Sequence, residues 1–300
     1  MDYAFETHKL LIERTTKTSC IIAAYNEETR IANVLEIAKS FPLFHEVIVI
    51  NDGSSDKTQT IIEKFLQRSK HLKVIELKKN LGKTNAILEG VKTSKGELLC
   101  FLDADLTNLL FDNIYKMIYF VLNKEYSMTI LDRAGDRAAP VGWTQSWIAR
   151  FNGGERTLWK KDFQKIKFPL ESRYALEQII NLHYISHGLR VRTIYCKNLI
   201  ASLQTEKRGI KAGILAYQKM FIELYKASKL KGLYIQIENI VEDRLEPLYR
   251  LMNKSNKKVI KKTSLLMIIV AGLITSTGTF LWLNAKNNIN KVTHKRKSRN

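Results

Sequence analysis

The chain has 300 residues, of which 45% are hydrophobic, and a formal net charge of +20. This length and apolar content predict one domain of about 200 to 250 residues with a buried core, plus an appendage. The three widely spaced cysteines, Cys20, Cys100 and Cys196, exclude a disulfide-rich fold and a cysteine-based zinc site. Two of them lie in apolar runs, which predicts buried free thiols in a reducing compartment.

The distribution of the positive charge says more than its sum. Residues 254–300 contain eleven Lys and Arg and no Asp or Glu, so this segment carries more than half of the net charge. The basic residues flank an apolar run at 264–284, an arrangement typical of contact with anionic lipid head groups. No pattern of base-stacking aromatic residues accompanies them. We therefore expect a membrane, and no nucleic acid, as the partner of this region.

Apolar runs alternate with amphipathic stretches along the chain. Buried strands are expected at 18–24, 46–50, 72–77, within 96–107, at 127–131 and at 189–195. Helical periodicity follows each of the first three strands, and further helices are expected at 109–122 and from residue 174. This alternation predicts an α/β fold with a mostly parallel sheet flanked by helices and joined by right-handed crossovers.

The fourth expected strand ends in two carboxylates, Asp103 and Asp105, on either side of Ala104. In open α/β sheets ligands bind at the carboxyl ends of the strands, so both acids lie where a ligand would. A divalent cation takes oxygen ligands and often uses only one or two protein carboxylates when substrate phosphates complete its shell. The alternative is a surface turn with two acids, which is the commoner explanation of an isolated Asp-x-Asp.

Polar loops follow the first three expected strands, at 25–29, 51–56 and 80–84. Taken singly, each is explained as well by a capped turn or by the start of a helix. Because the carboxyl ends of parallel strands share one edge of a sheet, the three loops are expected to meet the acid pair at one crevice. This convergence favours a binding site over an accidental pair of acids.

In this order the motifs resemble glycosyltransferase family 2, nucleotide-sugar transferases with the Rossmann-like GT-A fold, over about residues 17–135. The resemblance is carried by Ile21-Ile22-Ala23-Ala24-Tyr25-Asn26-Glu27-Glu28, Val49-Ile50-Asn51-Asp52-Gly53-Ser54-Ser55-Asp56-Lys57-Thr58, Asn80-Leu81-Gly82-Lys83 and Phe101-Leu102-Asp103-Ala104-Asp105. Ala23 stands where the family usually has proline, which removes a rigid turn but no reacting group.

The resemblance implies roles for residues of the first three motifs. Tyr25 and Glu27 would lie beside the nucleoside, next to Ala24. Asp52 would accept a hydrogen bond from the ring N–H of the base. Lys83 would approach the base or the diphosphate.

The resemblance also gives the acid pair a specific role. Asp103 and Asp105, with Ala104 between them, would hold Mg²⁺ or Mn²⁺ against the diphosphate of the nucleotide sugar. The ion would neutralise charge on the departing nucleoside diphosphate, which we expect to be UDP. Two acids this close together are poorly placed to act as the acid and base pair of a hydrolase.

The segment 151–162 resembles the Gly-Glu-Arg segment of polyprenyl-phosphate and phosphoglycerate glycosyltransferases. In that role Gly154 would let the backbone approach the sugar, Glu155 would face a hydroxyl, and Arg156 would face an anion of the acceptor. Related enzymes also place an acid on the helix expected from residue 174, which makes Glu177 a candidate base. Glu155 and Glu177 are the candidate catalytic residues; the alternatives are a glycine turn with a surface ion pair and a solvated helix residue.

One stretch departs from the family pattern. Relatives often carry a metal-binding histidine before a Glu-Lys-x-Gly segment, whereas residues 201–209 contain no histidine. Water or another side chain can complete a Mg²⁺ shell, so the third protein ligand is left open. His183 and His187, spaced i, i+4, have no third ligand nearby and are expected to be structural.

The expected organisation has six segments. They are an N-terminal extension at 1–16, a nucleotide-sugar-binding half at 17–135, an acceptor-site half at 136–230, an amphipathic basic linker at 231–263, a membrane helix at 264–284 and a basic tail at 285–300. The membrane helix is long enough to span a bilayer once, or it anchors the chain on one face. The polar N-terminus predicts no signal peptide. Because nucleotide sugars are cytosolic, we expect the catalytic domain on the cytosolic side of the cell membrane.

These features predict a membrane-anchored glycosyltransferase. It would move a sugar from a nucleoside diphosphate to a lipid such as polyprenyl phosphate or a glycolipid. A first alternative is an enzyme similar to glucosyl-3-phosphoglycerate synthase, with a small anionic acceptor. A second, prompted by the missing histidine, is a catalytically silent membrane-bound binding or scaffold protein.

Overall fold

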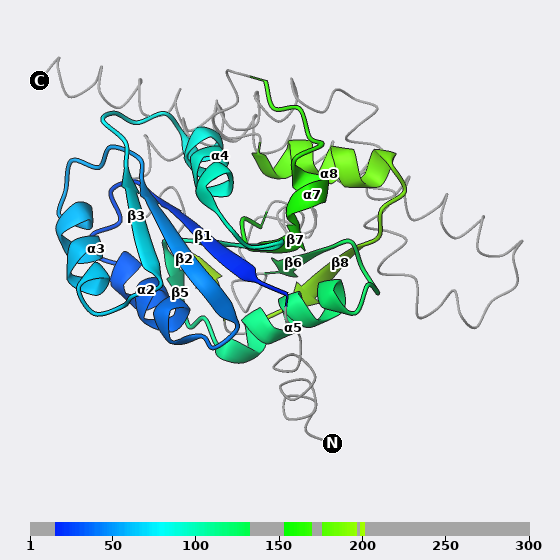
Figure 1. Cartoon of the computed structure of the whole chain (residues 1–300), viewed down its shortest axis with the longest axis horizontal. Coiled ribbons are helices and arrows are strands. Elements are labelled where there is room, and N and C mark those ends of the chain that lie inside the picture. The colour runs from blue at the N-terminus through cyan, green and yellow to red at the C-terminus, as the bar shows by residue number, and fades with distance from the viewer. Residues whose placement is uncertain (1–15, 133–152, 170–175, 197–198, 202–300) are drawn as a thin grey trace, which may run out of the picture. The chain divides into compact units, whose positions relative to one another are not determined.

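The structure is a computed structural model, and it describes residues 16–132, 153–169, 176–196 and 199–201 (Figure 1). All of these residues belong to one compact unit. The expected membrane helix at 264–284, the linker before it and the basic tail after it lie outside the described residues, as do the first fifteen. In the part that is described, no helix is long and apolar enough to cross a membrane.

Seven strands form a single mixed sheet in the order β3-β2-β1-β4-β7-β6-β8. They are β1 (Thr18–Ala24), β2 (Phe44–Asn51), β3 (Leu72–Glu76), β4 (Leu98–Asp103), β6 (Met128–Asp132), β7 (Arg156–Trp159) and β8 (Val191–Tyr195). Strands β1 to β4 are parallel, and so are β6 and β8, whereas β7 runs antiparallel to β4 and β6. The predicted mostly parallel sheet is confirmed.

Strand β7 is one of the elements that the sequence did not predict. It has only four residues, and the glycines just before it make the local sequence look like a turn. It lies between β4 and β6 and pairs with both. These two ladders satisfy the backbone groups of a buried segment that has too few residues to form a strand alone. Through β7, the predicted nucleotide-binding and acceptor halves share one sheet; the division between them stays a prediction.

Helices cover both faces of the sheet (Figure 1). They are α2 (Ile31–Ser40), α3 (Thr58–Leu66), α4 (Lys83–Thr93), α5 (Phe111–Leu122), α7 (Lys160–Phe163) and α8 (Leu176–Ser186). Helices α2, α3 and α5 pack their apolar residues into one core with the inward residues of the strands, such as Cys20, Ile22 and Val49. On the other face α4 approaches closely, since a Cβ on Gly90 would stand 2.7 Å from side-chain atoms of Ile21 and Ile50.

The order of the strands reverses beside β1. The chain proceeds from β1 through β2 to β3 on one side and then returns to place β4 on the other side of β1. Ala23 is in register with Asp103, so β1 and β4 end at the same level. A reversal of this kind opens a crevice at the carboxyl ends of the two strands, where ligands of α/β sheets bind.

A short ladder lies just beyond this edge. β5 (Leu106–Thr107) pairs antiparallel with β9 (Ile200–Ala201). Its backbone pairing joins the two residues that follow Asp105 to a segment almost 100 positions later in the sequence. The end of the predicted acid-pair motif is therefore held by backbone hydrogen bonds and not by its own loop alone.

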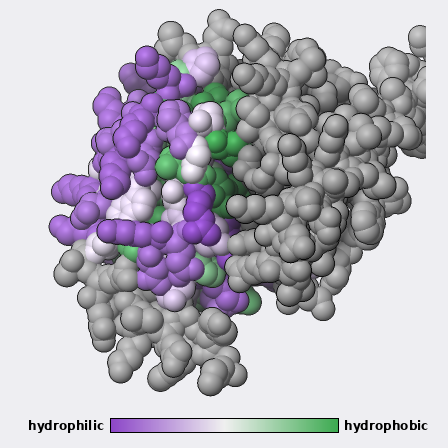
Figure 2. Space-filling model, turned by 90° about the vertical axis from the view of Figure 1, so that its right-hand side faces the viewer, coloured by the Kyte–Doolittle hydropathy of each residue, from purple (hydrophilic) through white to green (hydrophobic). Residues whose placement is uncertain are grey.

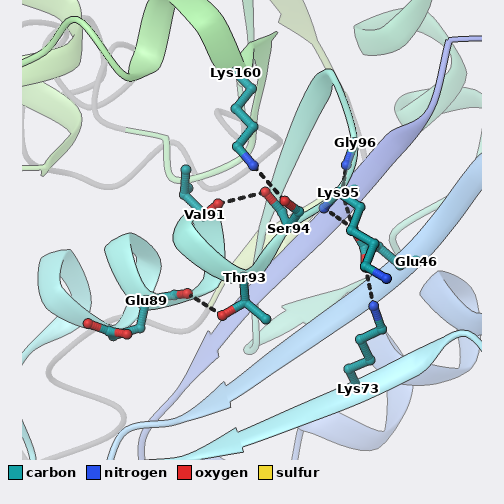
Figure 3. A network of polar contacts seen from close by, with 10 residues as sticks. Glu46, Lys73, Glu89, Val91, Thr93, Ser94, Lys95, Gly96 and Lys160 are labelled. Carbon is teal, nitrogen blue, oxygen red and sulfur yellow. Dashed lines mark hydrogen bonds and ion pairs between the residues drawn. The ribbon is translucent and has the colours of Figure 1, made fainter.

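At the amino ends of β1 and β2, opposite to the acid pair, lies a polar network centred on Glu46 (Figure 3). Its buried carboxylate accepts hydrogen bonds from Ser19 Oγ (2.6 Å), Lys73 Nζ (2.6 Å) and the backbone N–H of Lys95. Ser19 Oγ in turn accepts from the N–H of Gly96 at 2.8 Å. Burial alone would raise the pKa of Glu46, but these donors and the Lys73 charge lower it to about 2.

The surface of the described part is largely hydrophilic on the face drawn in Figure 2, with a smaller hydrophobic area beside it. Large hydrophobic side chains exposed within the described residues are Tyr25, Leu66, Leu110 and Tyr195. The three cysteines are buried and free, which confirms the predicted thiols.

Candidate active site

The loops after β1 and β2 are fastened together by side chains. Asn26, whose φ of 54° lies in the left-handed region that asparagine tolerates, accepts the N–H of Ser55 on its Oδ1 at 2.9 Å. Its own N–H donates to Ser54 Oγ at 3.0 Å, and the N–H of Glu27 donates to Thr58 Oγ1 at 2.8 Å. The two polar loops are therefore held together at the carboxyl ends of β1 and β2.

Asp52 organises the third loop. Its buried carboxylate accepts the backbone N–H of Leu81 on Oδ1 at 2.7 Å and that of Gly82 on Oδ2 at 2.9 Å. Its own N–H donates to the carbonyl of Ala24 at 2.8 Å. Asp52 thus links the ends of β1 and β2 to the start of α4. The predicted contact with a base stays a prediction, and it would have to be made by oxygens that already accept these backbone donors.

Gly53 permits the loops to approach this closely. Its φ is +68°, and a Cβ there would stand 2.6 Å from the carbonyl carbon of Lys79 and 2.7 Å from the nitrogen of Asn80. Any side chain at this position would combine backbone strain with a collision against backbone atoms.

The residue that joins the elements of the site is Lys83, the first residue of α4. Its Nζ donates to Asp103 Oδ1 at 2.6 Å and to Glu177 Oε1 at 2.7 Å. Asp103 ends β4 and Glu177 lies in the first turn of α8, so three elements meet at one ammonium. The side chains are 30% (Lys83), 17% (Asp103) and 11% (Glu177) exposed, which leaves the cluster partly open to solvent.

The ammonium of Lys83 is held in its charged form. Desolvation acts to lower the pKa of Lys83, but the charges and hydrogen bonds of Asp103 and Glu177 outweigh it and raise the pKa above the usual value. Lys83 therefore carries its positive charge throughout the physiological pH range.

Gly154 packs directly on this cluster. A Cβ at this position would overlap the Asp103 carboxylate and stand 2.5 Å from Lys83 Nζ. The absence of a side chain lets the backbone of the glycine-rich segment reach the end of β4. The structure thus brings together four of the predicted site residues: Lys83, Asp103, Gly154 and Glu177.

Asp105 and Ala104 follow Asp103 and are both nearly buried. Within the described ranges, no group of three or more His, Cys, Asp or Glu side chains is placed to hold a metal ion. Asp103 and Asp105 nevertheless provide hard oxygen donors one residue apart, a set that suits Mg²⁺ or Mn²⁺ when phosphate oxygens and water complete the shell. Of the stretch 201–209, where the family histidine is missing, only Ala201 is described.

The remaining predicted nucleotide residues differ in accessibility. Tyr25 lies just after β1 with 40% of its surface exposed, so its ring is available to a ligand. Glu27 is nearly buried, and its Oε2 accepts from Arg30 Nη1 at 3.3 Å. Glu27 thus contributes to the first loop as well as to any contact with a nucleoside.

Arg156 and Glu155 are fully buried. Arg156 donates from Nε to the carbonyl of Gly153 at 3.0 Å and from Nη1 to Asn181 Oδ1 at 2.6 Å. The guanidinium therefore fastens the glycine-rich segment to α8. An acceptor role for Arg156 or Glu155 stays a prediction, since neither side chain reaches solvent in the structure.

Two features of the site had no signal in the sequence. Asn181 lies in an apolar helix, and nothing in the pattern around it links it to Arg156. The pairing of Lys83 with Glu177 spans 94 positions and depends on how α8 packs. The histidine pair is stacked, with ring centroids of His183 and His187 4.2 Å apart, and no metal-binding group of described residues includes them.

The polar loops after β1, β2 and β3 and the acid pair after β4 lie in a stretch that matches a known family. The family model for glycosyl transferase family 2 matches residues 19–191, which contain all the described loops and the Lys83 cluster. The chain belongs to glycosyl transferase family 2. The resemblance found in the four motifs is thereby confirmed.

Curated relatives of this family 2 glycosyl transferase are similar over a limited stretch. Dolichyl-phosphate beta-glucosyltransferase from Homo sapiens is 38% identical over 102 residues, which are 30% of this chain and 32% of that protein. Undecaprenyl-phosphate 4-deoxy-4-formamido-L-arabinose transferase from Photorhabdus laumondii is 37% identical over 101 residues, 32% of this chain and 31% of that one. The match thus spans about a third of the length of these relatives.

Solved structures resemble the fold over a longer stretch. Glucosyl-3-phosphoglycerate synthase from Mycobacterium tuberculosis, in complex with Mg²⁺ and UDP, has a TM-score of 0.58 at 16% identity and covers 74% of this chain and 83% of its own. S. aureus TarS has a TM-score of 0.51 at 20% identity, with 76% and 70% covered. At these identities the similarity shows the α/β fold alone.

Proposed function

We propose that this family 2 glycosyl transferase moves a sugar from a nucleoside diphosphate, UDP, to a polyprenyl-phosphate lipid, assisted by a divalent cation. The observation that carries the proposal is the Lys83 cluster at the carboxyl end of β4. Its ammonium and two carboxylates, with Asp105 two residues beyond Asp103, lie near the loops after β1, β2 and β3 and would suit a diphosphate with its metal. The curated relatives, whose names specify dolichyl-phosphate and undecaprenyl-phosphate, support the lipid acceptor.

Asp103 and Asp105 are the residues that would hold Mg²⁺ or Mn²⁺. A bound divalent ion supplies Lewis-acid stabilisation of the charge that develops on a departing diphosphate. Lys83 adds a cation on a flexible stem with three donors, which suits it to contact oxygens of the diphosphate. The exposed ring of Tyr25 offers a stacking surface to the base.

The acceptor decides what the carboxylate of Glu177 does. A phosphate monoester has its second pKa near 6, so most of its molecules carry two charges at neutral pH and the attacking oxygen has no proton to lose. With a polyprenyl phosphate, Glu177 holds Lys83 and no general base is required. With the hydroxyl of a glycolipid, a base is required, and Glu177 is the partly accessible candidate.

We also place the reaction at the cytosolic face of the cell membrane, with residues 264–284 as the anchor. The support is the basic, apolar composition of residues 254–300 and the cytosolic supply of nucleotide sugars. A protease digestion of sealed vesicles that carry the chain with a C-terminal tag tests the single-span form. A tag that is protected from outside and inside attack alike would refute that form.

The reaction itself is tested with the purified full chain, Mn²⁺ and a panel of labelled nucleotide sugars. Polyprenyl phosphate in mixed micelles is the acceptor, and label is counted in the organic phase after extraction. We expect label in the lipid from a UDP-sugar, and its loss in Asp105→Ala. Label that stays in the aqueous phase with 3-phosphoglycerate would support a small anionic acceptor, and no transfer from any donor would support a silent binding protein.

A further inference from the structure

Lys83 contacts Asp103, one of the two carboxylates that we propose would hold the divalent ion. Lys83 Nζ lies 2.6 Å from Asp103 Oδ1. Mg²⁺ binds carboxylate oxygens at about 2.0 to 2.1 Å. An ammonium and a divalent ion on this one carboxylate would stand only a few ångström apart, where repulsion between the two cations is strong in a partly buried site.

The backbone closes one side of this ion pair. A Cβ on Gly154 would overlap the Asp103 carboxylate and stand 2.5 Å from Lys83 Nζ, so no room remains between the glycine-rich segment and the pair. A hydrated ion cannot enter from that side. The Lys83 side chain is 30% exposed and that of Asp103 is 17% exposed, so the pair is otherwise still partly open to solvent.

When a nucleotide binds, the ammonium of Lys83 can exchange Asp103 for another anionic partner. The lysine stem is flexible, and the second partner of Nζ, Glu177, lies on α8 and not on β4. A diphosphate would offer anionic oxygens beside the same group. Moving Nζ from Asp103 to these oxygens relieves the repulsion between cations and adds a charge-assisted hydrogen bond.

We propose that Lys83 competes with the divalent ion for Asp103, so that the ion binds tightly only together with a nucleoside diphosphate. Lys83 is then a positioning residue that makes binding of metal and donor interdependent. The inference rests on the proposed function, because it takes Asp103 and Asp105 as the carboxylates that hold the ion. It means that Lys83 weakens binding of the ion while no nucleotide is bound, an effect that a lysine with only a phosphate-binding role would not have.

The test is calorimetric titration of Mn²⁺ into the full chain, with and without UDP, which needs no turnover. Lys83→Met keeps the length of the side chain and removes its charge. We expect this variant to bind Mn²⁺ alone roughly tenfold or more tightly than the parent chain. The gain in Mn²⁺ affinity caused by UDP should shrink in the same variant. Mn²⁺ affinity that is unchanged or weaker in Lys83→Met overturns the competition.

Three further variants keep the result interpretable. Lys78→Met removes one charge from an exposed lysine five positions earlier and should leave Mn²⁺ binding unchanged. If Lys83→Met does not fold, as judged by its thermal transition, Lys83→Gln replaces it, since the amide can still donate to a carboxylate. Asp105→Ala separates the two proposals. Undiminished binding of Mn²⁺ with UDP in Asp105→Ala refutes the metal site, whereas lost binding there with no gain in Lys83→Met refutes the competition alone.

Discussion

Lys83 Nζ lies 2.7 Å from Glu177 Oε1, although the two residues are 94 positions apart in the sequence. The contact joins the first residue of α4 to the first turn of α8. It is one of the points at which the predicted nucleotide-binding half and the predicted acceptor half meet through side chains. Both partners are partly shielded from solvent, so the pair is stronger than an exposed surface pair would be.

The first prediction concerns Glu177→Gln. With polyprenyl phosphate as acceptor, we expect the transfer rate to fall less than about tenfold, because no proton has to be removed. With an alcohol or glycolipid acceptor, the loss of a base should cost about 10²- to 10⁴-fold. Initial rates at saturating donor for both acceptors measure the difference. Glu36→Gln, at an exposed carboxylate, is the matched control. A hundredfold loss with the phosphate acceptor would contradict the holding role.

The second prediction concerns Gly154→Ala. The new methyl group collides with the Asp103 carboxylate and Lys83 Nζ, so the cluster must rearrange. We expect binding of UDP with Mn²⁺ to weaken by about tenfold or more, since Asp103, a proposed metal ligand, is displaced. Calorimetry measures the affinity. Gly188→Ala is the control, because φ is +65° there and no atom lies within 4 Å of the added Cβ. That control should lose about 1 kcal/mol of stability and no binding. Equal binding in both variants would place the nucleotide elsewhere.

The third prediction concerns Arg156, whose guanidinium is fully buried between Gly153 and Asn181. Arg156→Met leaves buried acceptors without their donor, so we expect the free energy of unfolding to fall by about 3 kcal/mol. Arg156→Lys should not restore it, because a single ammonium lacks the planar fork. Denaturant unfolding provides the measurement.

A double-mutant cycle with Asn181→Ala is the control for this contact. The double variant should lose less free energy of unfolding than the sum of the two single losses, because both substitutions remove the same hydrogen bond. Unchanged stability combined with a raised KM for the acceptor would show instead that Arg156 faces the acceptor.

The fourth prediction is a pH dependence of stability at the amino ends of β1 and β2. The pKa of Glu46 is about 2 in the folded chain against an ordinary 4.5. Because the folded value is the lower one, the contribution is fully present above about pH 4.5 and is lost as the pH falls toward 2. Glu46→Gln should be less stable than the parent by about 2 kcal/mol at pH 7, and the difference should vanish near pH 2.

Urea unfolding at pH 7, 5, 4 and 3 traces this curve. Glu89→Gln, at a carboxylate that is 45% exposed, serves as the comparison and should follow the parent chain at every pH. A gap between Glu46→Gln and the parent that is constant with pH would mean that the network acts through packing and not through charge.

The sequence predicted the first half of the fold closely. The strand at 18–24 has the predicted bounds, β2, β3 and β6 differ from prediction by a residue or two at their ends, and β4 lies within the predicted stretch. Helix α5 begins at Phe111, two residues later than predicted. These elements are long apolar runs between polar loops, and burial of such a run on both faces needs no information from distant residues. The acid pair at the end of β4 was found for the same reason.

The contacts that make the site were decided by tertiary structure. Strand β7 exists because β4 and β6 offer hydrogen bonds on both sides of four residues that would not form a strand alone. Asp52 accepts hydrogen bonds from the backbone N–H groups of Leu81 and Gly82, a contact that no motif predicts.

The motifs of the sequence thus determined the family and the candidate residues of the site, because strand ends and loop composition are local properties. The tertiary structure decided which of these residues share a contact. The sequence does not show that Lys83 contacts Glu177 or that Arg156 contacts Asn181, because both partners lie on α8, far along the chain. The physical reason is that a buried charge requires a partner, and the partner is provided by packing between elements far apart in the chain.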